Sequence, residues 1–264
     1  MKKIVIPIGL VIVLIAGLMM TFSRGSAESP TFMREVLPKQ DGFASVGNGT
    51  TGGAHATEQN VFKVTNKKEF VAALKNRKNT APKIVLVYGT IDFDTDDTGK
   101  SLTVKDYMAD GYDFQEYLET HKPNSTAPKS LKDEQEEKRK ASQKNQSQSI
   151  TVHVPANTSI IGMDNAKLKG VDLVLDADNI IIRNIRFESP YDYFPAWDPK
   201  DGPEGNWNSQ YDSLSIKGGT HIWIDHCSFQ DGPETVETYF GRKYEHRDGL
   251  LDITNQADYI TISY

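Results

Sequence analysis

The stretch that decides the fold runs from Asn206 to Asp231 and reads NWNSQYDSLSIKGGTHIWIDHCSFQD. Two short segments rich in β-branched residues, SLSI and HIWIDHCSF, stand on either side of the turn at Gly218 and Gly219. The second segment contains an Ile-x-Ile pair, Ile222 and Ile224. Short apolar segments that are separated by glycine turns, with no helical pattern between them, predict an all-β structure.

The Ile-x-Ile pair recurs on both sides of this stretch. Ile180 and Ile182 lie 42 residues earlier, and Ile260 and Ile262 lie 38 residues later. Short strands that repeat every 20–40 residues predict a β-solenoid, a coil of parallel strands, with Ile182, Ile224 and Ile262 in one inward ladder. A β-sandwich is the alternative fold, but its hairpins favour Asn-Gly and Asp-Gly turns, which are sparse here. The predicted strands are TSIIG, VDLVL, NIIIRNIRF, SLSI, HIWIDHCSF and YITISY.

A short helix is predicted upstream of these strands. Asn66 can cap its N-terminus, and Glu69 stands three residues later, which is the capping-box spacing. An apolar face follows within residues 70–74, and the segment KIVLVY at 83–88 then predicts a strand. We expect this helix to cap an open end of the coil.

Residues 129–149 have a different composition, with many charges and neither Gly nor Pro. Glu134 with Lys138, and Glu136 with Lys140, form i,i+4 pairs in the favourable order. These pairs predict a charged, solvated helical excursion with little apolar face. A flexible charged linker is the alternative interpretation.

The N-terminus has the pattern of a secretory signal. Lys2 and Lys3 precede an apolar run from Ile4 to Met20, and the small residues Gly25-Ser26-Ala27 follow it. We therefore predict a signal peptide at 1–27, one domain at 28–264, and a secreted protein with no stable membrane association after cleavage. An uncleaved membrane anchor is the alternative, although the run is at the short limit for a membrane span.

Charge and cysteine content limit the possible functions. The net charge is −6, and it becomes −9 once the predicted signal is removed. This balance argues against a nucleic-acid-binding protein, which needs a basic surface. The single cysteine, Cys227, excludes an intramolecular disulfide, and its apolar neighbours favour a small buried side chain over a nucleophile.

Three aspartates are candidate metal ligands. Asp212 heads one predicted strand, and Asp248 and Asp252 lie four residues apart where the next coil should place the equivalent strand. On a strand, both of the latter would point to one face, and equivalent positions on stacked coils lie about 4.8 Å apart. Three such carboxylates repel one another unless a hard cation with oxygen ligands, above all Ca²⁺, lies between them. Aspartates of ordinary solvated turns are the alternative interpretation.

Several segments resemble the secreted bacterial calcium-dependent pectate lyases, and the resemblance covers nearly all of residues 28–264. They are PANTSIIG, NIIIRNIRFE, YDYFPAWDP, NWNSQYD, THIWIDHCSF, FGRKYEH and RDGLLD. The resemblance implies a right-handed parallel β-helix, with Ca²⁺ ligands at Asp212, Asp248 and Asp252. It also implies β-elimination on polygalacturonate, the backbone of pectin, by a protein that is a monomer when complete.

The same resemblance leaves the catalytic base unassigned. The family's catalytic arginine lies beyond the position that matches Tyr264, so the resemblance predicts a C-terminally incomplete domain and, for residues 28–264 alone, an essentially inactive fragment. Arg242 and Arg247 lie near the candidate site, and we interpret them as ion-pair partners of local acids such as Glu245 and Asp248. A non-catalytic β-helix that binds calcium or polysaccharide is the alternative function. A pectin lyase is disfavoured, because it does not need the three carboxylates.

Two other groups have a possible functional and a structural interpretation. Asp225 and His226 have the residue types for acid–base catalysis, but we expect His226 to be a hydrogen-bonded member of a stack within the coil. Four aromatic residues have the residue types for stacking on sugars, but we expect them to pack a long loop onto the coil. They are Tyr191, Tyr193, Trp197 and Trp207.

Overall fold

The computed structural model describes residues 31–203, 205–233 and 236–264. The predicted signal peptide at 1–27 lies outside these residues. Within them, no helix is both long enough and apolar enough to cross a membrane.

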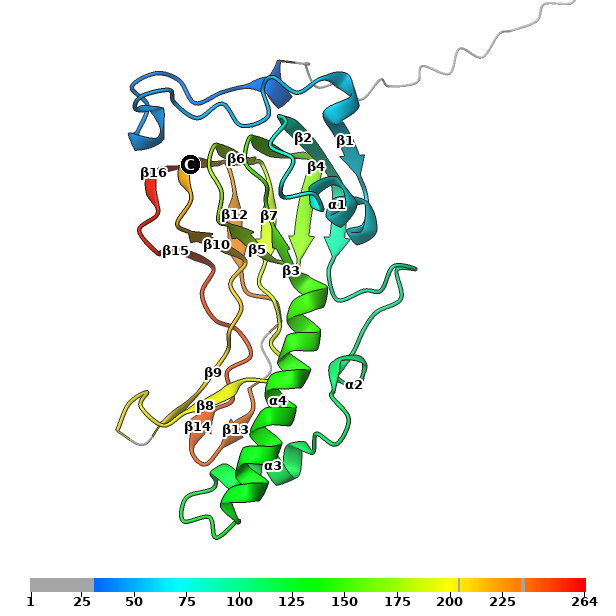
Figure 1. Ribbon diagram of the computed structural model, residues 1–264, viewed down its shortest axis with the longest axis vertical. Helices are drawn as coiled ribbons and strands as arrows, with labels where there is room; N and C mark the ends of the chain where they lie inside the picture. The colour runs from blue at the N-terminus through cyan, green and yellow to red at the C-terminus, as the bar shows by residue number, and fades with distance from the viewer. Residues whose placement is uncertain (1–30, 204, 234–235) are drawn as a thin grey trace, which may run out of the picture.

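Stacked parallel strands form the upper part of the molecule in Figure 1. One sheet has the order β1-β2-β4-β6-β11-β16, with β7 and β12 continuing it beside β4, and a second has the order β15-β10-β5-β3. Every strand pair in these two sheets is parallel, which excludes the β-sandwich and confirms an all-β, right-handed parallel β-helix. The strands are β1 (Val61–Val64), β2 (Lys83–Asp92), β3 (Thr151–His153), β4 (Thr158–Lys169), β5 (Asp172–Leu175), β6 (Ile180–Arg183), β7 (Arg186–Glu188), β10 (Leu214–Lys217), β11 (Thr220–Asp225), β12 (Ser228–Gln230), β15 (Leu251–Thr254) and β16 (Asp258–Ser263).

The predicted isoleucine ladder is present. Ile182 pairs with Ile224, and Ile224 pairs with Ile262, across β6, β11 and β16. Ile182 and Ile224 are buried in the core, whereas Ile262 is 52% exposed. The difference arises because β16 is the outermost strand of its sheet, so only one neighbouring strand covers it.

Two segments predicted as single strands are each divided in two. NIIIRNIRF forms β6 and β7 with Asn184 between them, and HIWIDHCSF forms β11 and β12 with His226 between them. Asn184 has φ 57° and His226 has φ 49°, so each residue turns the chain in the left-handed region. These turns are the corners of the coil, which a pattern of alternating side chains does not reveal.

The predicted capping helix is α1 (Lys67–Leu74). The Asn66 side chain accepts a hydrogen bond from the Glu69 amide (3.0 Å), and Glu69 in turn accepts one from the Thr65 amide (2.8 Å). Phe70 and Leu74 are buried in the same core cluster as the isoleucine ladder. The helix therefore covers the apolar interior next to β1, β2 and β3, as the sequence predicts.

The charged segment forms one long helix, α4 (Lys129–Ile150), which excludes the flexible linker. Of the two predicted pairs, Glu136 with Lys140 is an ion pair (3.5 Å), whereas Lys138 donates to the Asp110 carbonyl. The expectation of a solvated helix holds for only part of its surface. A polar face is buried and hydrogen-bonded, and its members are Gln135, Arg139, Ser142, Gln143 and Gln146.

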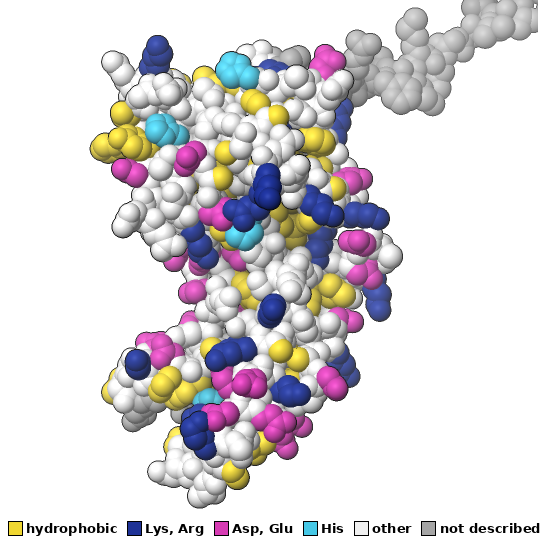
Figure 2. Space-filling model, in the orientation of Figure 1, with side chains coloured by type: hydrophobic (Ala, Val, Ile, Leu, Met, Phe, Trp, Pro, Cys, Tyr) yellow, Lys and Arg dark blue, Asp and Glu magenta, His cyan; other side chains and the backbone are white. Residues whose placement is uncertain are grey.

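The buried face of α4 packs on a second, aromatic core in the lower part of Figure 1, here called the aromatic lobe. Trp207 is fully buried there, and Tyr193 and Trp197 pack against the same core, so these residues have a packing role as expected, although their core is separate from that of the coil. Figure 2 shows Lys and Arg side chains mixed with Asp and Glu over the outside of this lobe. Its elements are α2 (Val104–Tyr107), α3 (Phe114–His121), β8 (Ala196–Asp198), β9 (Asn206–Asn208), β13 (Thr238–Tyr239) and β14 (Arg242–Lys243).

The N-terminal segment crosses the outer face of β6 and β11. It contains the short helices η1 (Phe32–Arg34), η2 (Phe43–Ser45) and η3 (Glu58–Asn60). Arg183 attaches it to the coil, because its guanidinium lies over the rings of Phe32 (5.0 Å) and Trp223 (4.5 Å). The same guanidinium pairs with Glu35 and Asp225, both at 2.7 Å.

Candidate metal centre

Asp212 lies just before β10 and is buried, with 7% of its surface exposed. Its Oδ2 accepts a hydrogen bond from Ser215 Oγ (2.9 Å), whereas its Oδ1 is buried and has no hydrogen-bond partner among the described residues. Burial raises the pKa of Asp212, and the nearby Asp252 and Asp248 carboxylates raise it further, against the effect of Ser215. A buried oxygen with no hydrogen-bond donor, close to other carboxylates, is energetically unfavourable, and a bound cation would remove this cost.

Asp252 lies on β15, and its register partner on β10 is Ser215. The carboxylates of Asp252 and Asp212 border the same small space, which exists because residue 249 is glycine. A Cβ on Gly249 would lie 2.9 Å from Asp212 Oδ1 and 3.4 Å from Asp252 Oδ1. The structure thus brings together two of the three predicted ligands from neighbouring coils.

Asp248 was predicted to share a strand with Asp252, and this was wrong. β15 begins only at Leu251, so Asp248 lies in the irregular segment that leads into the strand. Burial raises the pKa of Asp248, as does the Asp252 carboxylate, against a hydrogen bond from the Gly249 amide. Asp248 is therefore close to the pair, but the strand ladder does not place it.

The described ranges contain no group of three His, Cys, Asp or Glu side chains already in metal-ligating geometry. The donor set nevertheless suits a hard cation, because all three candidate side chains are carboxylates. Such a cation would occupy the space over Gly249 and would give Asp212 Oδ1 the partner that it lacks among the described residues. The residues present therefore fit Ca²⁺ better than zinc, which prefers His and Cys ligands.

Arg247 does not pair with Glu245 or Asp248 as predicted. Its Nη1 donates to the Ser189 carbonyl, to Ser189 Oγ (3.0 Å) and, more distantly, to the Pro190 carbonyl (3.5 Å). Its Nη1 is thus bonded to oxygens of a distant segment, and we do not assign it as a general base. Arg242 lies on β14 in the aromatic lobe, opposite Tyr239.

Asp225 and His226 belong to the framework of the coil. The Asp225 carboxylate is buried and accepts hydrogen bonds from Arg183, His226 and Ser263. The His226 ring stacks on the Tyr264 ring, with 4.2 Å between centroids and 21° between planes. The interpretation of His226 as a hydrogen-bonded member of a stack is confirmed.

Cys227 is partly buried and packs against the main core. Burial raises the pKa of its thiol to about 11, so almost no thiolate is present near neutral pH. The interpretation of Cys227 as a small core side chain rather than a nucleophile is confirmed.

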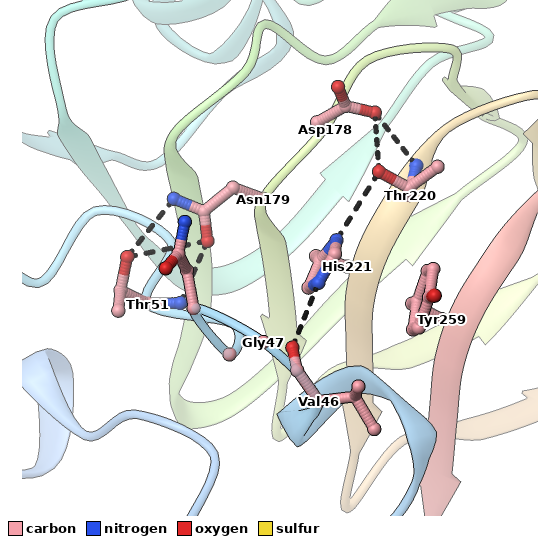
Figure 3. Close-up of a pocket in the computed structure, with 10 residues that line it drawn as sticks. Val46, Gly47, Thr51, Asp178, Asn179, Thr220, His221 and Tyr259 are labelled. Atoms are coloured by element: carbon pink, nitrogen blue, oxygen red, sulfur yellow. Dashed lines mark hydrogen bonds between the residues drawn. The ribbon is translucent and has the colours of Figure 1, made fainter.

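A separate pocket of about 550 Å³ lies between the loop at 46–51, the turn that precedes β6 and the first residues of β11 and β16 (Figure 3). The Asn179 Oδ1 accepts hydrogen bonds from the amides of Thr51 (2.7 Å) and Gly52 (2.8 Å), and His221 Nε2 lies 3.1 Å from the Val46 carbonyl. These contacts attach the N-terminal segment to the coil. The pocket lies near the end of β10 that is opposite to Asp212, so it is distinct from the candidate metal centre.

The sequence matches the family model described as "Pectate lyase" at residues 9–108 and 126–264. A pectate lyase of Bacillus subtilis (strain 168) is 46% identical over 257 residues, which cover 96% of this chain and 61% of that protein. Pectate lyase D of Dickeya chrysanthemi is 34% identical, over 95% of this chain and 53% of that protein. The chain thus spans about three-fifths of the length of the first relative and about half of the second.

Solved structures show the same likeness. A mutant of Bacillus subtilis pectate lyase superposes with a TM-score of 0.83 at 47% identity, over 88% of this chain and 59% of that one. A pectate lyase bound to hexasaccharide gives a TM-score of 0.81 at 47% identity, with the same coverage. A pectate lyase from Acidovorax avenae subsp citrulli gives 0.71 at 31% identity, over 90% of this chain and 59% of that one. The sequence match and the shared parallel β-helix lead to one conclusion: this chain belongs to the pectate lyase family.

Proposed function

We propose that the protein is a secreted, calcium-dependent pectate lyase that cleaves polygalacturonate by β-elimination and acts as a monomer. The observation that carries the proposal is the space over Gly249, which is bordered by Asp212 and Asp252 and lies next to Asp248. Similar proteins named pectate lyase, one of them solved with a hexasaccharide, support the choice of substrate.

Asp212, Asp248 and Asp252 would hold the cation. When bound, Ca²⁺ would bind the carboxylate of a uronate residue and acidify the proton on the adjacent carbon. Ser215 supports this arrangement, because its hydrogen bond fixes one oxygen of Asp212 and leaves Oδ1 directed to the shared space. The chain has a net charge of −6 and would repel a polyanionic substrate. A cation held by the three carboxylates would supply the local positive charge that attracts such a substrate.

Elimination breaks two bonds on one sugar residue. A base takes the acidified carbon-bound proton, the electron pair forms a carbon–carbon double bond, and the glycosidic oxygen leaves with the other half of the chain. Arg247 is not assigned as the base, because its Nη1 donates to the carbonyl and hydroxyl of Ser189. The base stays unassigned, and the proposal rests on the cation site.

The test is the release of unsaturated products from polygalacturonate, measured as rising ultraviolet absorbance, with Ca²⁺ present and then with a chelator. We expect any rise in absorbance to require Ca²⁺ and to stop when the chelator is added. Calorimetric titration should show that Asp248→Ala weakens Ca²⁺ binding, whereas His226→Ala, which changes a stack within the coil, leaves it unchanged. Equal Ca²⁺ binding by wild type and Asp248→Ala would contradict the assignment of the site.

A further inference from the structure

Asp248 is the candidate ligand whose position the β-helix itself does not explain. Asp252 is held by strand pairing with Ser215, and Asp212 is held by the Ser215 side chain. Asp248 lies in an irregular segment before β15, so ladder hydrogen bonds do not fix its backbone. Its position must come from contacts made by its neighbours in the sequence.

His246 supplies the first of these contacts. Its carbonyl accepts a hydrogen bond from the Asp192 amide (2.8 Å), and its Nδ1 lies 2.6 Å from the Asp192 carbonyl. Its ring stacks on Tyr191, with centroids 4.1 Å apart and planes 14° apart. These contacts hold residue 246 against the corner of the coil that follows β7.

Arg247 supplies the second contact and lies directly before Asp248. Its Nη1 donates to the carbonyl and hydroxyl of Ser189, and its guanidinium carbon lies 5.6 Å from the centroid of the Tyr191 ring. Ser189 Oγ also donates to Asp231 Oδ1 (2.8 Å), which ties the loop after β12 to the same corner. Arg247 thus joins the segment before β15 to a corner 58 residues earlier in the chain.

A glycine makes this geometry possible. A Cβ on Gly232 would lie 2.4 Å from Arg247 Nη2, so only glycine lets the guanidinium reach its position. The same guanidinium and Asp248 line a common pocket of about 320 Å³. A partly buried side chain with several hydrogen bonds is an anchor of the type that fixes a ligand-bearing segment.

We propose that Arg247 is a positioning residue, which holds the segment that carries Asp248 against Ser189 and so sets the third carboxylate of the cation site. This inference rests on the proposed function, because it assumes that Asp248 binds Ca²⁺. Positioning and simple charge effects act in opposite directions. A nearby positive charge by itself weakens cation binding, so its removal should tighten binding unless the guanidinium places the ligand.

The test is calorimetric titration with Ca²⁺ alone on the wild type and on Arg247→Met, which keeps an unbranched apolar side chain but removes the charge and the donors. We expect Ca²⁺ affinity to fall by about tenfold or more, as is typical when a group that orients a ligand is lost. Arg247→Lys retains the charge and part of the donor capacity, and should give an intermediate affinity. It also provides the measurement if the methionine variant does not fold.

Arg183→Met is the matched control. Like Arg247, Arg183 is bonded to several acceptors and lies over aromatic rings, but it is buried and attaches the N-terminal segment. This variant should have a lower melting temperature and an unchanged Ca²⁺ affinity. The rise in melting temperature on adding Ca²⁺ should likewise shrink for Arg247→Met and not for Arg183→Met.

The outcomes separate this inference from the proposed function. If the wild type binds Ca²⁺, Asp252→Ala abolishes the binding, and Arg247→Met binds as tightly or more tightly, then the positioning role is wrong while the cation site stands. If the wild type does not bind Ca²⁺, both the site and the positioning role are wrong.

Discussion

Ser215 and Asp252 are direct partners across β10 and β15, and Ser215 Oγ also donates to Asp212. One serine therefore connects the register of two coils to the orientation of a carboxylate. Because neighbouring parallel strands lie about 4.8 Å apart, this register places Asp252 within reach of the space that Asp212 borders. The close approach of two acids is thus a consequence of strand pairing.

Gly249→Ala should weaken Ca²⁺ binding by about tenfold or more, because the new methyl group would occupy the space that a cation with ligand distances of about 2.3–2.6 Å needs. The φ of Gly249 is not positive, so alanine fits the backbone. Calorimetric titration with Ca²⁺ measures the effect. Gly47→Ala is the control, since it adds strain at φ 65° but meets no atom within 4 Å and should leave Ca²⁺ affinity unchanged. Equal affinities for the two variants would contradict a cation over Gly249.

The increase in melting temperature that Ca²⁺ produces should become smaller as the pH falls. The pKa values of Asp212 and Asp248 are raised, so protons compete with the cation at a higher pH than for ordinary aspartates. In the metal-free protein these raised values mean that the folded state binds more protons than the unfolded state. The contribution of these two groups to stability therefore becomes more favourable as the pH falls toward the unfolded value of about 4. Melting temperatures measured with Ca²⁺ and with chelator should converge between about pH 8 and pH 4, and a constant difference would contradict the prediction.

Ile224→Ala should lower the free energy of unfolding by about 2–5 kcal/mol, because Ile224 is buried between Ile182 and Ile262 in the core ladder. Ile262→Ala is the matched control on the same ladder, and its cost should be smaller because that side chain is 52% exposed. Chemical denaturation of both variants gives the comparison. Similar losses from the two substitutions would argue against a ladder that is buried at Ile224 and open at Ile262.

Arg139→Met should destabilise the aromatic lobe. Arg139 is buried and donates to Glu136, to Gln143 Oε1 (3.1 Å) and to the Phe194 carbonyl (2.8 Å), so its loss removes the central donor of this network. A cost of about 3 kcal/mol is typical when one partner of a buried pair is removed.

Lys140→Met tests the specificity of that effect, because Lys140 pairs with the same Glu136 from a largely exposed position. Removing an exposed partner should cost less than about 1 kcal/mol. Thermal denaturation of the two variants should therefore differ clearly. If Lys140→Met were as damaging as Arg139→Met, the polar face of α4 would not be the stabilising contact.

The repeating part of the fold could be predicted from the sequence, because its determinants are local. The Ile-x-Ile spacing fixes which side chains enter the core, and the cap formed by Asn66 and Glu69 starts α1 at the expected residue. Asp212 and Asp252 could be predicted as neighbours for the same reason, since strand register carries them together.

What the sequence could not reveal depends on partners that are far apart along the chain. The position of Asp248 is one case, because Arg247 meets Ser189 from 58 residues away and no local period encodes that contact. The buried polar face of α4 is another, since Gln143 looks like a solvated residue until Asp192, 49 residues later, accepts its hydrogen bond. The sequence by itself determined the coil and its inward ladder, because side-chain alternation and capping act over a few residues. Only the tertiary structure decided which loops attach to that coil, because hydrogen bonds between distant segments exist only after the chain has folded.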